Sequence, residues 1–387
     1  MLQMKISGIK YMESFARQNP EIISLSQGSL KVGGIPKEIK SYTQDILNTD
    51  KTDYYANSYG VPEFREKLAT TLSQKHNTNI SSNQILVTHG SSGAIAALLL
   101  SILGTGDEVL LPEPTYPAYS KLAQVAKAKT VFVPCLQSTN SQNINWSIDI
   151  EKIKAATTQR TKIIIITNPS NPTGTIIPSK TLHELANWCN EKGIYLISDE
   201  VYDDYIFDGE YQSITPLVNE SSHIIRCGSF SKNFSMSGWR VGYAVMPEEM
   251  IENVSAVQDS LIVCPSVVGQ YAALYALDHP ELTQKFAEEV QNNLTIANKI
   301  LQPLVTKSIV SYQKPQAAFY LFLKTTKKDT SDLCLDIMQK SKVTTVPGST
   351  FGPSGDPFIR ICFARERHVL EEGLNRFVNY FTNYWNH

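Results

Sequence analysis

The chain has 387 residues, and its 35 lysines and arginines nearly balance its 37 aspartates and glutamates, so the formal net charge is −2 at pH 7. This balance excludes the basic footprint of a nucleic-acid-binding protein, and no apolar run reaches the roughly 18 residues of a membrane-spanning helix. A hydrophobic share of 42% is ordinary for a folded protein, and at roughly 100–200 residues per domain we expect two or three domains. We expect neither nucleic acid nor a membrane as a partner.

Short strands alternate with helices between residues 84 and 246. The expected strands are 84–88, 108–111, 130–134, 162–167, 194–198, 223–227 and 241–245, and the expected helices are 91–103, about 118–128, and 179–192. The run Ile163–Ile166 is continuously apolar, which is typical of a strand buried on both faces. This alternation predicts βαβ units on a largely parallel sheet flanked by helices, an α/β fold class.

The two ends of the chain follow a different pattern. Residues 1–47 are loop-rich, with one expected helix at 37–47, and we interpret them as an N-terminal arm and part of a small domain. Residues 48–280 form the expected large domain, which ends near Asp278–Pro280. Residues 281–387 form the expected α+β small domain, with a helix at 281–303, strands at 318–323 and 358–363, and an amphipathic helix over Arg367–Trp385.

The cysteines and the N-terminal residues indicate in which cellular compartment the protein is expected. The six cysteines are scattered without a C-x-x-C pair, so we expect neither a disulfide framework nor a metal site. The run Met1–Ser7 lacks the apolar core of a signal peptide. Both patterns predict a cytoplasmic protein.

Polar residues follow the predicted strands, at the sheet edge where open α/β sheets bind ligands. Gly90–Ala94 runs into a helix whose N-terminus would favour an anion, although a serine helix cap explains the same residues. Asn171 lies in a turn rich in Asn, Pro and Gly, where it is either a turn residue or an amide donor to a ligand. Asp199 follows the next strand, either as a helix cap or as the partner of a buried cation.

Three cations are candidates for ligand chemistry. Lys232 is the only cation between Gly228 and Gly238. A lysine is usually a solvated surface residue, but one held out of water has a lowered pKa and becomes a nucleophile. Arg240 could clamp a phosphate with two hydrogen bonds. Arg360 lies inside an apolar strand, where it either forms an internal ion pair or grips a substrate carboxylate.

Taken together, these residues resemble the fold-type-I pyridoxal-phosphate enzymes, specifically the class I aminotransferase family that includes aspartate, aromatic and alanine aminotransferases. The resemblance covers nearly the whole chain and implies a seven-stranded-type, mostly parallel sheet in the large domain. The motifs that carry it are Tyr55 with Gly60 and Pro62–Arg65, Gly90–Ala94, Pro112–Pro117, Asn171–Gly174, Asp199–Tyr202, Ser229 with Lys232, Gly238–Gly242, and Arg360.

The resemblance implies that pyridoxal 5′-phosphate is held as an internal aldimine on Lys232, whose freed amine then shuttles a proton. Asp199 would pair with the pyridine nitrogen, and Tyr116 would stack on the ring. Asn171 and Tyr202 would hydrogen-bond the phenolic oxygen of the ring. The implied phosphate ligands are Ser91, Ser92, Ser229 and Arg240.

The resemblance also bears on the substrate and on assembly. Arg360 would bind the substrate α-carboxylate, with Gly28 and Asn171 beside it. The family places the tyrosine that matches Tyr55 in the neighbouring subunit's site, which implies a homodimer. Many relatives have a Glu-Pro-Asp-Phe-like run where this chain has Ser29–Gly34. Aspartate, aromatic, alanine or other neutral amino donors, with 2-oxoglutarate as acceptor, therefore remain open.

Three functions are compatible with these residues. The leading hypothesis is an aminotransferase that acts on an amino acid and a 2-oxo acid. The second is a β-elimination (C–S) lyase that uses the same Lys232 and Asp199 and releases thiol or ammonia without an acceptor. The third is a non-catalytic binding or regulatory protein, against which the intact lysine and aspartate argue.

Overall fold

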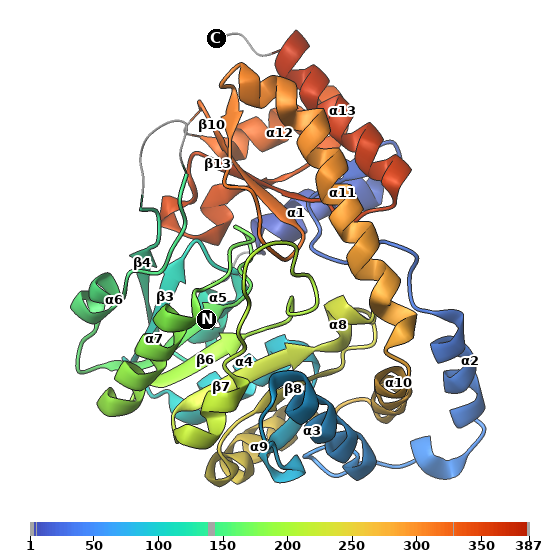
Figure 1. The fold of residues 1–387 in the computed structure, drawn as a ribbon, viewed down its shortest axis with the longest axis vertical. Coiled ribbons are helices and arrows are strands. Elements are labelled where there is room, and N and C mark those ends of the chain that lie inside the picture. The colour runs from blue at the N-terminus through green and yellow to red at the C-terminus, as the bar shows by residue number, and fades with distance from the viewer. Residues whose placement is uncertain (1–3, 5, 138–143, 328, 385–387) are drawn as a thin grey trace.

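The computed structural model describes residues 4, 6–137, 144–327 and 329–384, which form two lobes (Figure 1). The lower lobe in this view holds a seven-stranded sheet of order β2-β8-β7-β6-β5-β3-β4. The upper lobe holds a four-stranded sheet of order β12-β13-β10-β9, and β1 pairs with β11 in a separate two-stranded sheet.

The seven-stranded sheet is parallel except for β8, which runs antiparallel to both of its neighbours. Its strands are β2 (Ile85–Thr88), β3 (Glu108–Glu113), β4 (Lys129–Pro134), β5 (Thr161–Thr167), β6 (Tyr195–Asp199), β7 (Ile224–Ser229) and β8 (Gly242–Val245). In β5, Ile163 and Ile165 face one core cluster while Ile164 and Ile166 face another. Successive strand residues point to opposite faces, so this strand is buried on both sides, as its apolar run predicts.

Helices cover both faces of the large sheet. One core cluster packs α4 (Gly90–Ile102), α5 (Ala118–Val125) and α9 (Glu248–Ile262) against it. The other packs α2 (Lys37–Ile46), α3 (Pro62–His76), α6 (Ile150–Ala156), α7 (Ser179–Lys192) and α10 (Val267–Asp278). The predicted α/β class with a mostly parallel sheet is confirmed.

The upper lobe packs four helices around its small sheets. The helices are α1 (Gly8–Gln18), α11 (Glu281–Thr306), α12 (Thr330–Ser341) and α13 (Arg367–Asn383). The strands are β1 (Ile23–Ser24), β9 (Val310–Ser311), β10 (Tyr320–Thr325), β11 (Val343–Thr344), β12 (Val346–Pro347) and β13 (Phe358–Cys362). Proline lacks a backbone N–H and disfavours a helical residue before it, so Pro280 separates α10 from the long α11.

The structure differs from the sequence-based expectation near both ends. Residues 1–47 hold two helices rather than one, because α1 is present as well as α2. Helix α1 contacts β11 and β12 of the upper lobe, whereas α2 packs on α10 of the lower lobe. The last predicted residue of the C-terminal helix, Trp385, and most of Met1–Ser7 lie outside the described residues. The division at 47/48 and 280/281 stays a prediction.

Two further observations concern the chain as a whole. All six cysteines are free thiols, and five of them are buried. Within the described part of the chain, no helix combines the length and the apolar character that crossing a membrane requires.

Candidate active site

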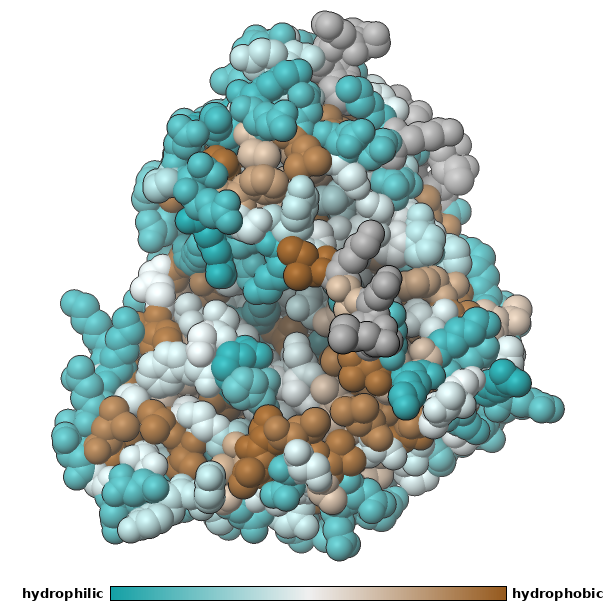
Figure 2. Space-filling view, turned by 180° about the vertical axis from the view of Figure 1, so that it is seen from behind, coloured by the Kyte–Doolittle hydropathy of each residue, from teal (hydrophilic) through white to brown (hydrophobic). Residues whose placement is uncertain are grey.

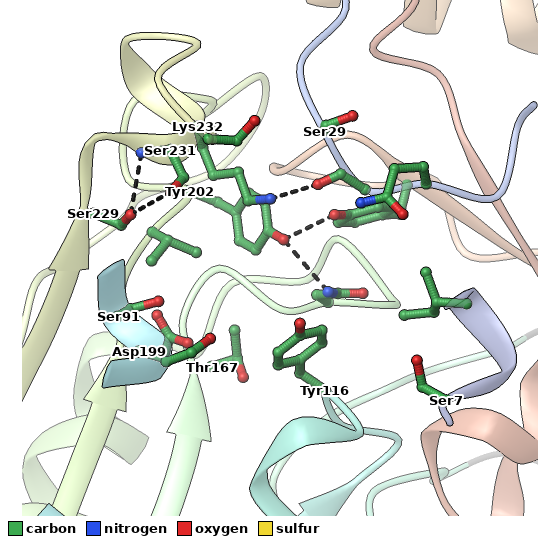
Figure 3. A pocket seen from close by; sticks show the side chains of 18 of the residues that line it. Ser7, Ser29, Ser91, Tyr116, Thr167, Asp199, Tyr202, Ser229, Ser231 and Lys232 are labelled. Atoms are coloured by element: carbon green, nitrogen blue, oxygen red, sulfur yellow. Dashed lines mark hydrogen bonds between the residues drawn. The ribbon is translucent and has the colours of Figure 1, made fainter. Parts of the chain in front are cut away.

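A cavity of about 550 Å³ opens between the two lobes, at the carboxyl ends of β5, β6 and β7 (Figure 3). The lower lobe contributes the N-terminus of α4 and the short α8 (Phe230–Asn233). The upper lobe contributes residues of β10 and β13, and residues of the segment 7–29 also line the cavity. The residues that follow separate strands in the sequence therefore meet in one place, as sheet topology predicts.

Lys232 projects from α8 into this cavity (Figure 3). Its amine donates a hydrogen bond to the carbonyl oxygen of Gly28 and lies 6.0 Å from the ring centre of Tyr202. Burial lowers the pKa of Lys232 to about 8, and the positive charges of Arg360 and Arg240 act in the same direction. The amine is therefore a proton acceptor close to neutral pH.

Asp199 lies at the end of β6 and is almost fully buried. One carboxylate oxygen, Oδ2, accepts a hydrogen bond of 2.7 Å from Tyr119, whose hydroxyl also lies 2.9 Å from Thr167 Oγ1. The other oxygen, Oδ1, is buried and has no hydrogen-bond partner among the described residues. Burial raises the pKa of Asp199 to about 6, against the opposing effects of the Tyr119 bond and the Lys232 charge.

The neighbouring Glu200 has a structural partner that Asp199 lacks. Its carboxylate accepts a 2.9 Å hydrogen bond from Nε of Arg226, and the same guanidinium donates from Nη2 to Asp203 at 2.8 Å. Arg226 and Glu200 are fully enclosed. The buried guanidinium of Arg226 is therefore paired with Glu200 and Asp203 and not with Asp199.

Tyr202 is the centre of a buried hydrogen-bond chain. Its hydroxyl lies 2.8 Å from the hydroxyl of Tyr320 and accepts from Nδ2 of Asn171 at 3.4 Å (Figure 3). Burial raises the pKa of Tyr202 well above its ordinary value, so the phenol is neutral and can donate its hydrogen.

Arg360 extends this chain from β13. Its Nη1 donates to Oδ1 of Asn171 at 3.1 Å, Nη2 donates to the Ser26 carbonyl, and the guanidinium lies 4.5 Å from the ring centre of Tyr320. Its Nε has no partner among the described residues, although the residue is fully buried. No carboxylate in the described residues pairs with Arg360, so the internal ion pair considered from sequence is absent there.

The N-terminus of α4 and Arg240 form a potential anion cradle. Ser91 and Ser92, in the first turn of α4, line the cavity together with Arg240. Gly90 has φ of +71°, a conformation that favours glycine, and a Cβ there would lie 2.6 Å from Nη2 of Arg240 and push the guanidinium aside. Free N–H groups and a cation at a helix N-terminus favour a phosphate.

Ser229 ends β7 beside this cradle and caps α8. Its hydroxyl accepts from the backbone N–H of Ser231 at 3.1 Å and lies 3.2 Å from the Val241 carbonyl oxygen. This cap aims the first turn of α8, and with it Lys232, at the cavity.

Most of the sequence-predicted residues meet in the cavity, and one does not. Tyr116 and Gly28 line it, and Tyr116 packs edge-to-face on Tyr119 with ring centres 5.6 Å apart. Tyr55 is 83% exposed and is not part of the cavity of this chain. The roles assigned to all these residues stay predictions.

Sequence reasoning missed several lining residues, notably Gln27, Tyr119, Thr167, Ser231 and Tyr320. Tyr119 lies on α5 and Tyr320 within β10, so a search restricted to residues that follow strands does not find them. Thr167, however, is the last residue of β5, and its position was an available signal.

Comparison with known proteins agrees with this geometry. Residues 20–377 match the family model described as aminotransferase class I and II. The curated aspartate aminotransferase of Pyrococcus abyssi is 33% identical over 377 residues, which cover 96% of this chain and 94% of the relative. The aromatic-amino-acid aminotransferase 2 of Thermococcus litoralis is 31% identical, with the same two coverages.

Solved structures of aminotransferases are also similar to this chain. The aspartate aminotransferase of Thermus thermophilus, solved with maleate, has a TM-score of 0.88 and 27% identity over 97% of both chains. That of Thermotoga maritima has a TM-score of 0.88 and 28% identity over 98% of both chains.

The chain belongs to the aminotransferase class I and II family. Within it the chain is an enzyme, a transaminase of the pyridoxal-phosphate-dependent kind, similar to the aspartate aminotransferases. The predicted resemblance and the predicted reaction class are thereby confirmed. The β-elimination lyase is not favoured, because the named relatives are aminotransferases.

Proposed function

We propose that this chain moves an amino group from an L-amino acid to a 2-oxo acid and that it holds pyridoxal 5′-phosphate through Lys232. The observation that carries the proposal is the buried, unpartnered Oδ1 of Asp199, in the same cavity as an amine whose pKa is lowered to about 8. A buried polar atom without a partner needs an explanation, and a protonated ring nitrogen would supply one.

The residues present fit the cofactor. Asp199 offers an acceptor for the ring nitrogen, and Lys232 offers the amine that bonds the cofactor covalently. The cradle of Ser91, Ser92 and Arg240 offers donors and positive charge to the phosphate. Five cations line the cavity, whereas Asp199 is the one acid among its described lining residues, so the site favours an anionic ligand.

When bound, pyridoxal phosphate supplies a ring that withdraws electrons and stabilises negative charge at the substrate α-carbon. Asp199 would keep a proton on the ring nitrogen, because a carboxylate beside a cation favours the charged pair. Nζ of Lys232 would carry the proton to and from the substrate α-carbon, a task for which a pKa near the working pH is suited. Tyr202 and Asn171 would hold the ring's phenolic oxygen by hydrogen bonds.

Arg360 would bind the substrate α-carboxylate. Its buried Nε has no partner among the described residues, and its orientation is fixed by Asn171 and the ring of Tyr320. A planar guanidinium held in this way matches the two oxygens of a carboxylate. Aspartate or an aromatic or neutral amino acid, with 2-oxoglutarate as acceptor, is the proposed substrate pair, in line with the names of the relatives.

We further propose a homodimer in which Tyr55 reaches the partner's cavity. Tyr54 and Tyr55 are 77% and 83% exposed, and Leu261 at the end of α9 is 55% exposed. Figure 2 shows apolar side chains at the surface of the lower half, the half that holds the seven-stranded sheet in Figure 1. Covering such side chains would favour association. The cytoplasmic location also stays a prediction.

A screen of amino acids and 2-oxo acids with the purified, cofactor-loaded protein tests the proposal. The expected result is a change in the cofactor's absorption spectrum with a suitable amino acid and its reversal by a 2-oxo acid. Borohydride reduction followed by peptide mapping should label Lys232, and Lys232→Ala should lose the label while keeping the fold. Failure of every amino acid to convert the cofactor, or labelling of another lysine, would contradict the proposal.

A further inference from the structure

A phenol hydroxyl from α5 reaches the buried carboxylate of Asp199. Tyr119, in the first turn of α5, is 1% exposed and lines the cavity. Its hydroxyl lies 2.7 Å from Oδ2 of Asp199 and 2.9 Å from Oγ1 of Thr167. Thr167 and Asp199 are paired neighbours at the ends of β5 and β6, so this hydroxyl bridges two adjacent strands (Figure 3). Neither Tyr119 nor Thr167 takes part in the proposed chemistry.

The direction of both hydrogen bonds follows from the hydrogens that are available. An ionised carboxylate only accepts, so the Tyr119 hydroxyl donates its single hydrogen to Asp199. The same hydroxyl can then only accept from Thr167, whose hydroxyl is the donor. Burial raises the pKa of Tyr119 well above its ordinary value, so the hydrogen stays on the phenol. The chain from Thr167 through Tyr119 therefore directs its hydrogens toward the carboxylate.

Asp199 needs such a donor because its surroundings otherwise favour the neutral acid. Burial is the largest effect on its pKa and raises it, and the negative charge of Glu200 acts in the same direction. The hydrogen bond from Tyr119 is the largest opposing effect, ahead of the positive charge of Lys232, and the resulting pKa is about 6. Burial raises the pKa of the other titratable groups that interact with Asp199, so they are uncharged at neutral pH; they are Tyr116, Tyr202 and Cys227.

We propose that Tyr119, oriented by Thr167, is a positioning residue that keeps the Asp199 carboxylate ionised and fixed in place for the protonated ring nitrogen of the cofactor. The inference rests on the proposed function, because the pairing of Asp199 with the ring nitrogen is itself proposed there. A hydrogen bond to the charged form of a group favours that form, and one bond to an ionised acceptor corresponds to about one to two pH units. Without the Tyr119 hydroxyl, Asp199 would therefore keep its proton up to about pH 7–8.

The test compares two ligands that differ only at the ring nitrogen. They are pyridoxamine 5′-phosphate, the amino form of the cofactor, and its 1-deaza analogue, which has a C–H group in place of that nitrogen. Neither forms a covalent bond with Lys232, so calorimetry with the full-length apoprotein gives both dissociation constants from about pH 5 to about pH 8. The ratio of the two constants cancels the titration of Lys232 and of the phosphate, which both ligands share.

In the wild type, the preference for the ring that contains nitrogen should rise with pH as Asp199 ionises, with a midpoint near pH 6. Tyr119→Phe should move this midpoint upward by about one to two pH units, which lowers the preference at pH 7 by about two- to tenfold. Thr167→Val removes the donor to Tyr119 and should cause a smaller shift in the same direction. Tyr312→Phe is the matched control, because it removes a hydroxyl that donates to Asn298 at 2.8 Å and does not line the cavity, and it should leave the midpoint unchanged.

A purely structural role for Tyr119 would weaken the binding of both ligands by the same factor at every pH. That result, or an unmoved midpoint in a Tyr119→Phe protein that is folded by circular dichroism, overturns the inference. If Tyr119→Phe does not fold, an unmoved midpoint in Thr167→Val overturns it instead. A wild type without any preference for the ring nitrogen overturns the inference together with the proposed role of Asp199.

The failure of the proposed reaction is distinguishable from these results. If the midpoints shift as expected but no amino acid converts the cofactor, the proposed transamination is wrong, while Tyr119 still holds Asp199 in its ionised form.

Discussion

The lowered pKa of Lys232 gives a prediction with a definite size. Burial brings this pKa to about 8, compared with the ordinary value of 10.5. At pH 7 about 9% of an amine with pKa 8 is neutral, whereas about 0.03% of an amine with pKa 10.5 is neutral. The Lys232 amine of the apoprotein is therefore about 300 times more often in its nucleophilic form than an ordinary lysine.

Competitive acylation of the apoprotein over a range of pH, read by peptide mass spectrometry, measures this directly. The labelling of Lys232 should rise with a midpoint near pH 8. Arg360→Met removes a positive charge and should move the midpoint upward, while Asp199→Asn removes a negative charge and should move it downward. A midpoint above about pH 10, or no opposite response of the two variants, would refute the idea that burial and local charge control this amine.

Three stability predictions follow from the buried polar groups. Burial raises the pKa of Asp199 from 3.8 to about 6. As pH rises through this window, the free energy of unfolding of the apoprotein should therefore fall by about 3 kcal/mol relative to that of Asp199→Asn. Equal pH profiles of the two proteins in urea titrations would contradict this prediction. Arg226→Met leaves Glu200 without its buried partner and should lower the free energy of unfolding by about 3–5 kcal/mol, and a loss below 1 kcal/mol would show that the pair is replaceable. Tyr320→Phe removes the 2.8 Å bond to Tyr202 and should destabilise by about 1 kcal/mol in the same assay, whereas an unchanged midpoint would mean that the bond contributes nothing.

The central sheet could be predicted from sequence because its strands are short apolar runs that end in turn residues. Helix α7, for example, begins at Ser179 and ends before Gly193, whose φ is +65°, as expected. Helix α1 was missed although its signals are present: Ser7 caps it, and Ile9 and Met12 are buried three residues apart. The polar residues between them, in a short segment near a chain end, weaken the helical pattern.

The site was predictable only in part, because sheet topology places some of its residues and long-range packing places others. Asp199 is the last residue of β6 and Lys232 lies three residues after β7, so the topology brings them together wherever the sheet forms. Gln27 and Tyr320 reach the cavity because the upper lobe packs on the lower lobe. This packing joins residues that are far apart in the sequence, as in the hydrogen bond between Gly28 and Lys232, which are 204 positions apart. Local sequence does not encode such pairings, and a lone glutamine carries no motif.

The hydrogen bond from Lys232 to the Gly28 carbonyl links the amine that we propose to react to the N-terminal segment. If that amine reacts as proposed, this contact is given up, and the stretch around Gly28 then keeps its position through the three carbonyls that accept hydrogen bonds from Arg365. Arg365 does not line the cavity, yet its loss would free the backbone of this stretch and so shift the surroundings of the amine that we propose to react.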